Sequence, residues 1–186
     1  MSAQAPTIVL VGLMGTGKTT VARLLAEHYG VECLDTDRLV EQRAGRSVRS
    51  IFDTDGEPAF RILESEVLET CLRTPGGCVI AGAGGVVLRE ENRSALRAAS
   101  ARGAQVVWLQ AAPELLAKRT ARGQHRPLLD ADREGTLRRM ADERTAMYSE
   151  VADITVDVSE RSAESVTRLV IAAVDEAVRM GGHGDV

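Results

Sequence analysis

The chain has 186 residues, of which 44% are hydrophobic, 27% charged and only 3% aromatic. This length predicts one globular domain, and the aliphatic content excludes a disordered or collagen-like chain. The net charge of −4 favours neither nucleic acid nor an anionic membrane as a partner. No apolar run reaches the roughly 18 residues of a membrane span, and the first residues lack signal-peptide features, so we expect a cytoplasmic protein.

Along the chain, short β-branched runs alternate with longer segments of helical periodicity. This alternation predicts an α/β fold in which helices cover both faces of a parallel sheet. Strands are expected at residues 7–11, 32–34, 78–81, 105–109 and 153–156. Helices are expected at residues 18–29, 57–72, 91–101, 113–121, 132–149 and 163–180.

A glycine-rich segment, the P-loop (residues 12–19), follows the first predicted strand and matches the pattern G-x-x-x-x-G-K-[ST]. Glycines allow backbone N–H groups to surround phosphate oxygens, and the next helix adds the partial positive charge of its N-terminus. Lys18 is expected to neutralise the β- and γ-phosphates, and the Thr19 hydroxyl to bind Mg²⁺. The nucleotide-binding residues predicted here are Gly12, Met14, Gly15, Thr16, Gly17, Lys18, Thr19 and Thr20.

A nucleoside triphosphate site is shared by GTPases, motors and small-molecule kinases. The chain has no N-K-x-D run for guanine and no D-x-x-G run after a strand, which disfavours a GTPase. Its length is typical of small-molecule kinases that carry this loop. The remaining motifs therefore have to indicate the phosphate acceptor.

The second predicted strand ends in Leu34-Asp35-Thr36-Asp37, at the sheet edge where α/β proteins bind ligands. Residues two apart in an extended chain point the same way. Asp35 and Asp37 are therefore expected to converge, one near Mg²⁺ and one near an acceptor hydroxyl. The alternative for Asp37 is to cap a helix that begins at Arg38.

The next predicted helix carries Glu57, Arg61 and Glu64 at helical intervals. A carboxylate in this set can hold the guanidinium of Arg61 as a fixed fork for a carboxylate on the substrate.

With these motifs, the chain resembles the shikimate kinase family from residue 8 to about residue 156. Three further segments match in order: Ala81-Gly82-Ala83-Gly84-Gly85, Arg126-Pro127-Leu128-Leu129 and Glu143-Arg144-Thr-Ala-Met-Tyr148. The resemblance implies a nucleoside-monophosphate-kinase-like P-loop fold with a five-stranded parallel sheet. It also implies ATP- and Mg²⁺-dependent phosphorylation of the 3-hydroxyl of shikimate, giving shikimate 3-phosphate for aromatic amino acid biosynthesis, by a monomer.

The resemblance further divides the single domain, residues 1–186, into parts. These are a core sheet with the P-loop (7–34 and 77–110), a substrate-binding segment (35–72), a lid (about 112–133) and a C-terminal helix (163–180).

The family's residue roles carry over to matching positions. Asp35 resembles the carboxylate that holds Mg²⁺ through water, beside Thr19. Asp37 resembles the group that binds the substrate hydroxyls and accepts the proton. Arg126 resembles the lid arginine that closes over the phosphates, and Arg119 the one that stacks on adenine. Lys18, Asp37 and Arg126 are therefore the expected catalytic residues.

The substrate carboxylate has its own set of matching residues. Arg61 and Arg144 resemble the two arginines that clamp it, and Glu64 the carboxylate that orients Arg61. Gly84 and Gly85 resemble the residues whose N–H groups meet the ring hydroxyls.

Two other functions stay open. One is a kinase of another small polyol, either a cyclitol or gluconate, and the other is a nucleotide-binding module without turnover. A cyclitol without a carboxylate would leave Arg61 and Arg144 without a partner, which favours an acidic substrate, although gluconate is acidic too. A binding module has no need of an acceptor base such as Asp37 or of a closing lid.

Overall fold

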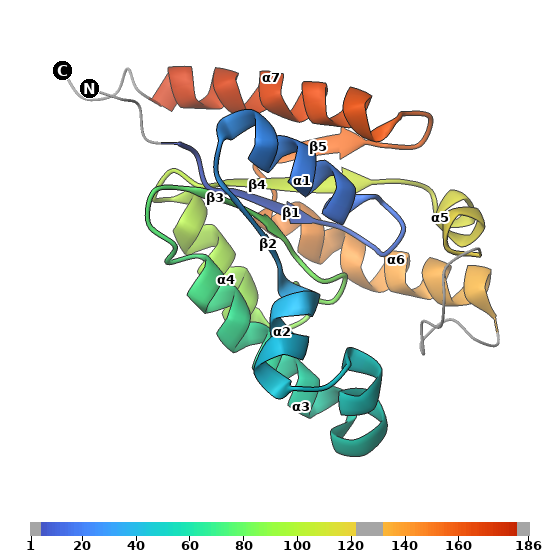
Figure 1. Ribbon diagram of the computed structural model, residues 1–186. Helices are drawn as coiled ribbons and strands as arrows, with labels where there is room; N and C mark the ends of the chain where they lie inside the picture. The colour runs from blue at the N-terminus through green and yellow to red at the C-terminus, as the bar shows by residue number, and fades with distance from the viewer. Residues whose placement is uncertain (1–4, 122–131, 182–186) are drawn as a thin grey trace.

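The computed structural model describes residues 5–121 and 132–181, in which a parallel sheet lies between two layers of helices (Figure 1). These residues form five strands: β1 (Ile8–Val11), β2 (Glu32–Asp35), β3 (Cys78–Ala81), β4 (Gln105–Gln110) and β5 (Ile154–Asp157). The strand order is β2-β3-β1-β4-β5, and every neighbouring pair is parallel. The predicted α/β fold is confirmed, with strand ends displaced by at most one residue.

One face of the sheet is covered by α1 (Lys18–Tyr29) and α7 (Ala163–Gly181), which lie side by side above it in Figure 1. Ile8 and Leu10 of β1 are fully buried in the cluster on this face, together with Leu25 of α1. Because successive strand residues point to opposite faces, the other residues of β1 belong to the opposite layer.

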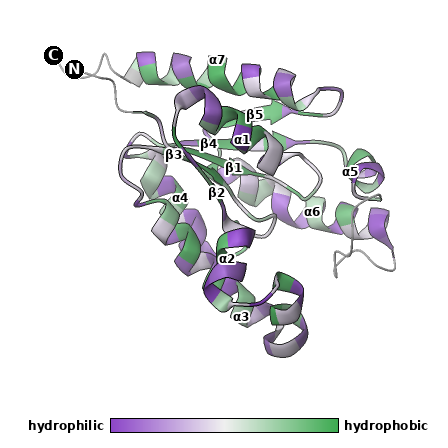
Figure 2. Ribbon diagram, in the orientation of Figure 1, coloured by the Kyte–Doolittle hydropathy of each residue, from purple (hydrophilic) through white to green (hydrophobic). Residues whose placement is uncertain are grey.

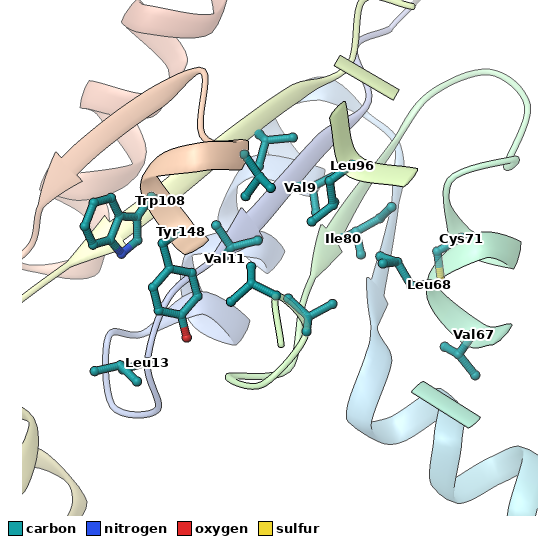
Figure 3. Close-up of a cluster of buried hydrophobic side chains, with 14 of the residues drawn as sticks. Val9, Val11, Leu13, Val67, Leu68, Cys71, Ile80, Leu96, Trp108 and Tyr148 are labelled. Carbon is teal, nitrogen blue, oxygen red and sulfur yellow. The ribbon is translucent and has the colours of Figure 1, made fainter. Parts of the chain in front are cut away.

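That opposite layer is formed by α3 (Val48–Cys71), α4 (Glu90–Ser100) and α6 (Arg133–Val151). Figure 3 shows part of its core, where Val9 of β1 and Ile80 of β3 belong to one cluster with side chains of the helices. Burial on both faces explains why the inner strands are continuously apolar, and they form the hydrophobic centre of the molecule in Figure 2. The short helix α5 (Pro113–Thr120) packs against α6.

Helix α2 (Thr36–Ala44) is absent from the elements predicted by the sequence pattern. Only Thr36 and Val40 of this helix are buried, so it lacks the apolar stripe that reveals most helices. Its start is set by Asp35, whose Oδ1 accepts a hydrogen bond from the N–H of Arg38 at 3.3 Å. Its end is set by Gly45, which has a left-handed φ of 67°.

Helix α3 begins at Val48 rather than at the predicted residue 57. The side chain of Ser47 caps it by accepting a hydrogen bond from the N–H of Ser50 at 3.1 Å. Gly56 interrupts the helix with φ 81° and ψ 170°, directly before the segment that contains Arg61. The sequence pattern therefore detected only the second half of a kinked helix. No helix in the two described ranges is both long and apolar enough to cross a membrane.

Candidate active site

A cavity of about 670 Å³ opens where β1 ends and α1 begins. Strands β1 and β4 are neighbours, and the connection after β1 leads to β2 on one side of the sheet whereas the connection after β4 leads to β5 on the other. Such a reversal is the usual place for a ligand in an α/β sheet. Thirteen of the predicted site residues line this cavity: Met14, Gly15, Gly17, Lys18, Thr19, Thr20, Asp35, Asp37, Arg61, Gly84, Gly85, Arg119 and Arg144. Arg126, the predicted lid arginine, lies outside the described residues.

Two predicted nucleotide-binding residues, Gly12 and Thr16, shape the P-loop rather than line the cavity. Gly12 has φ 138°, and a Cβ atom there would lie 2.4 Å from the carbonyl oxygen of Leu109. Thr16 is buried, and its Oγ1 donates a hydrogen bond to the carbonyl oxygen of Leu13 at 2.9 Å. Both residues hold the loop close to the end of the sheet, while residues 14, 15 and 17–20 line the cavity.

Lys18 is the first residue of α1, and its ammonium group bends back over the loop. Its Nζ donates hydrogen bonds to the carbonyl oxygens of Gly12 at 2.8 Å and Leu13 at 3.0 Å. The cation is thus held beside the N-terminus of α1, whose partial charge is also positive. Together they form a site for an anion.

The two residues predicted to hold Mg²⁺ are in direct contact. Thr19 Oγ1 donates a hydrogen bond to Asp35 Oδ2 at 2.9 Å. A hydroxyl and a carboxylate are hard oxygen donors of the kind that Mg²⁺ binds, and this ion commonly takes its remaining ligands from water and phosphate. The donor set therefore fits a Mg²⁺ ion that is shared with a bound nucleotide.

Asp37 has a different backbone conformation from the one that the sequence predicts. It lies in the first turn of α2, not in an extended chain, and the helix cap is Asp35 rather than Asp37. Asp37 lines the cavity and is exposed to it. Partial desolvation by the surrounding protein and the nearby charge of Asp35 raise the pKa of Asp37, while Lys18 and Arg61 oppose the rise. A carboxylate with a raised pKa is suited to accept a proton.

Arg61 is a buried cation held by two carboxylates. Its Nη1 donates to both oxygens of Glu64, at 3.0 and 3.1 Å, and Glu64 is 0% exposed. Its Nη2 and Nε both donate to Oε1 of Glu57, at 2.7 and 3.1 Å. Burial raises the pKa of Glu64 to about 7, although Arg61 opposes the rise. The geometry agrees with a carboxylate holding Arg61, and adds Glu57 to the expected Glu64.

Arg144 lines the cavity from α6, next to the glycine-rich turn of residues 81–85 that follows β3. Its Nη1 donates to the carbonyl oxygen of Gly84 at 3.1 Å. Its Nε is buried and has no hydrogen-bond partner within the described ranges. A buried N–H group without an acceptor is costly. Because this atom is not exposed, the contact of Arg144 with the cavity comes from other atoms of its side chain.

Sequence reasoning did not assign a role to Tyr148. Its hydroxyl donates to the carbonyl oxygen of Gly84, as Arg144 does, and its ring stacks on Trp108 with 5.7 Å between centroids. Figure 3 shows the two rings together at the end of the core. Arg144 and Tyr148 are four residues apart and share one helix face, which is the sequence signal that connects them.

Sequence reasoning also missed an apolar wall of the cavity. Phe52 and Phe60, the only two phenylalanines of the chain, line it from α3 with 4.8 Å between ring centroids. The guanidinium of Arg61 lies 5.1 Å from the centre of the Phe60 ring. The concentration of both rings near Arg61, in a chain poor in aromatic residues, could have indicated this wall.

Arg119 marks the opposite end of the cavity. Its Nη2 donates to the carbonyl oxygens of Val158 at 2.9 Å and Ser159 at 3.2 Å, in the loop after β5. The guanidinium is thereby fixed on the far side of the P-loop from Arg61. The cavity thus has a cationic position at each end, with the P-loop between them.

Comparison with known proteins identifies the relatives of this chain. The family model for shikimate kinase matches residues 14–175. A shikimate kinase from Symbiobacterium thermophilum is 46% identical over 178 residues, which cover 94% of this chain and 99% of the relative. The solved structure of a shikimate kinase from Acinetobacter baumannii in complex with shikimate is 35% identical, with a TM-score of 0.85, and covers 92% of this chain and 93% of its own.

A gluconokinase from Sinorhizobium meliloti is also similar in structure, with a TM-score of 0.58 and 18% identity over 98% of this chain and 99% of its own. At that identity the likeness concerns the fold alone.

Proposed function

The chain belongs to the shikimate kinase family, and we propose that its cavity transfers the γ-phosphate of ATP to the 3-hydroxyl of shikimate. The observation that carries this proposal is that Asp37, Arg61 and Arg144 line the same cavity as Lys18 of the P-loop. An acceptor with a carboxylate and a hydroxyl can therefore meet the phosphate inside one enclosure. The alternative acceptor gluconate is a further test case, because it too carries a carboxylate.

The ATP side of the cavity supplies positive charge. Lys18 would exchange the carbonyl oxygens of Gly12 and Leu13 for β- and γ-phosphate oxygens. Mg²⁺ would be held by Thr19 directly and by Asp35 through water, and would neutralise phosphate charge. Arg119 would stack on adenine, and Arg126, outside the described residues, would close over the phosphates as part of a lid (about 112–133).

The acceptor side fixes the orientation of the substrate within a substrate-binding segment (35–72). Arg61 and Arg144 would bind its carboxylate, and the N–H groups of Gly84 and Gly85 its ring hydroxyls. Neither of these two N–H groups donates a hydrogen bond in the described part of the chain, which supports their availability. Phe52 and Phe60 exclude water from this end, and so protect ATP from hydrolysis.

In the transfer step, the 3-hydroxyl oxygen bonds to the γ-phosphorus while the bond from that phosphorus to the β–γ bridging oxygen breaks. The hydroxyl proton passes to a carboxylate oxygen of Asp37. Lys18 stabilises the charge on the phosphate oxygens in the transition state. ADP and shikimate 3-phosphate are the products.

We also propose that the protein is a cytoplasmic monomer, as the sequence and the family resemblance lead us to expect.

The direct test is to measure ADP release from ATP and Mg²⁺ in the presence of shikimate, quinate, gluconate or an uncharged cyclitol, beside a control without acceptor. Stimulation by shikimate alone supports the proposal. Stimulation by gluconate would replace the acceptor, and no stimulation with ATP still bound would indicate a binding module.

Lys18→Ala should lower kcat by at least ~10²-fold, while Arg61→Ala should act mainly on the KM for shikimate.

A further inference from the structure

Each nitrogen of the Arg61 guanidinium already donates at least one hydrogen bond in the protein without ligand. Glu64 accepts from Nη1, and Glu57 accepts from both Nη2 and Nε. A carboxylate that binds a guanidinium through two parallel hydrogen bonds needs N–H groups on two different nitrogens. An acidic substrate therefore cannot bind Arg61 in this way unless one of the two carboxylates gives way.

The surroundings of the two carboxylates decide which one can leave. Glu64 is fully buried, so its release would leave an unpaired charge in the interior. The side chain of Glu57 is 47% exposed and can rotate into water. Glu57 also directly follows the kink at Gly56, where the backbone departs from helical φ and ψ angles. The exposed partner is the one that can be exchanged at small cost.

We propose that Glu57 occupies the place on Arg61 that the substrate carboxylate takes, and that it sets substrate affinity by competing for Nη2 and Nε. This inference rests on the proposed function, in which Arg61 binds the carboxylate of the acceptor. One carboxylate replaces another during binding, so the guanidinium is never left buried with Glu64 as its sole partner. The exchange also selects for acidic acceptors, since a neutral polyol cannot compensate the loss of Glu57.

The competition has a measurable sign. If the Glu57-bound form dominates without substrate, the apparent affinity for shikimate equals the intrinsic affinity multiplied by the small fraction of protein in which Glu57 has left Arg61. Weakening the contact should increase affinity, whereas a residue that merely supports Arg61 would decrease affinity when removed. The direction of the change in Kd thus separates competition from support.

The experiment measures the Kd for shikimate by titration calorimetry in the wild type, Glu57→Gln and Glu57→Asp. Glu57→Gln removes the charge, and Glu57→Asp keeps the charge but shortens its reach. Both should lower Kd, by about 3- to 10-fold for Glu57→Gln and less for Glu57→Asp. The Kd of the shikimate carboxamide, which lacks the charge, should stay within about 2-fold in both variants.

The matched control is Glu69→Gln. Glu69 lies in the same helix and pairs with Arg73 four residues later, and both side chains are exposed. This variant should leave the Kd for shikimate unchanged. An unchanged or higher Kd in Glu57→Gln would overturn the proposal, and so would a gain in Glu57→Gln with none in Glu57→Asp, which would point to a long-range charge effect.

Arg61→Ala distinguishes the failure of this inference from the failure of the proposed function. If Arg61→Ala leaves the Kd for shikimate unchanged, Arg61 does not bind the carboxylate, and the proposed acceptor site is wrong. If Arg61→Ala weakens binding while Glu57→Gln fails to strengthen it, the acceptor site stands and the competition by Glu57 is wrong.

Discussion

The contact between Gly85 and Arg61 leaves no room for a side chain on the turn. A Cβ atom on Gly85 would lie 2.1 Å from Nη1 and 2.4 Å from Cζ of Arg61. Gly85 has no positive φ, so its requirement is space rather than backbone freedom. Ala83, two residues earlier, carries a side chain without difficulty, and its N–H donates to Thr36 Oγ1 at 2.9 Å.

Gly85→Ala should raise the KM for shikimate by roughly 10- to 10²-fold, because the new methyl group displaces the guanidinium of Arg61. Steady-state kinetics at saturating ATP measure the effect. Gly84→Ala is the comparison variant: it adds a methyl group to the same proposed substrate site, but its Cβ would meet the backbone nitrogen of Met14 at 3.4 Å rather than Arg61. Equal effects of the two substitutions would show that the contact with Arg61 is not the cause.

The raised pKa of Asp37 predicts how activity depends on pH. In its proposed role as proton acceptor it must be ionised, so kcat/KM should fall on the acid side with an apparent pKa above the roughly 3.9 of an ordinary aspartate. Stability changes in the opposite direction. The folded form binds this proton more tightly than the unfolded chain, so its contribution is fully present below the unfolded pKa and is lost as pH rises through the folded one.

The pH dependence of kcat/KM in Glu64→Gln checks which carboxyl is responsible, because the pKa of Glu64 is also raised, to about 7. The acid limb should persist in Glu64→Gln and be absent from the residual activity of Asp37→Asn. Loss of the limb in Glu64→Gln alone would reassign it to the pair of Glu64 with Arg61.

At the scale of elements, Thr36 joins the ends of two strands. Its Oγ1 donates to the carbonyl oxygen of Ala81 at 3.3 Å and accepts from the N–H of Ala83, and the residue is 0% exposed. The start of α2 is thereby tied to the glycine-rich turn after β3. Asp37 and Gly84 come from these two segments, so this contact sets their separation.

Thr36→Val should destabilise the protein by about 1–3 kcal/mol, because it leaves the buried N–H of Ala83 without an acceptor. Chemical denaturation measures the free energy of unfolding. Thr36→Ser keeps the hydroxyl and should restore most of the stability and of kcat/KM. The role of this hydrogen bond is refuted if Thr36→Val and Thr36→Ser unfold alike.

At the scale of the whole molecule, the cavity gathers segments that are far apart in the chain. The P-loop follows the central strand β1, α2 and α3 project from one side, and α5 and α6 lie on the other (Figure 1). In the proposed function, the acceptor would contact Arg61 from α3 and Arg144 from α6, and the nucleotide would contact the loop between them. Each ligand should therefore stabilise the folded protein through a separate set of residues.

Ligand binding to the folded form should raise the melting temperature. At ~100 times its Kd a ligand contributes about 2.7 kcal/mol, which corresponds to roughly 5–10 °C for a chain of this length. Differential scanning fluorimetry with shikimate, with ATP and Mg²⁺, and with neither measures both shifts. Arg61→Ala should abolish the shift at the same shikimate concentration and keep the ATP shift, whereas loss of both would argue against separate contacts.

The sequence by itself determined the α/β class, the P-loop and the family, because these depend on local patterns. Apolar runs specify buried strands, and the fixed spacing of glycines, Lys18 and Thr19 specifies a phosphate site within one short segment. Even so, α2 escaped notice, since a mostly exposed helix has little periodicity, and so did the first half of α3 before the kink at Gly56.

Only the tertiary structure decided how the side chains meet. The hydrogen bond of Tyr148 to Gly84 and the space required at Gly85 beside Arg61 both depend on packing between elements. No local pattern encodes such distances, because Gly84 and Tyr148 are 64 residues apart in the chain and come together only when the helices close over the sheet.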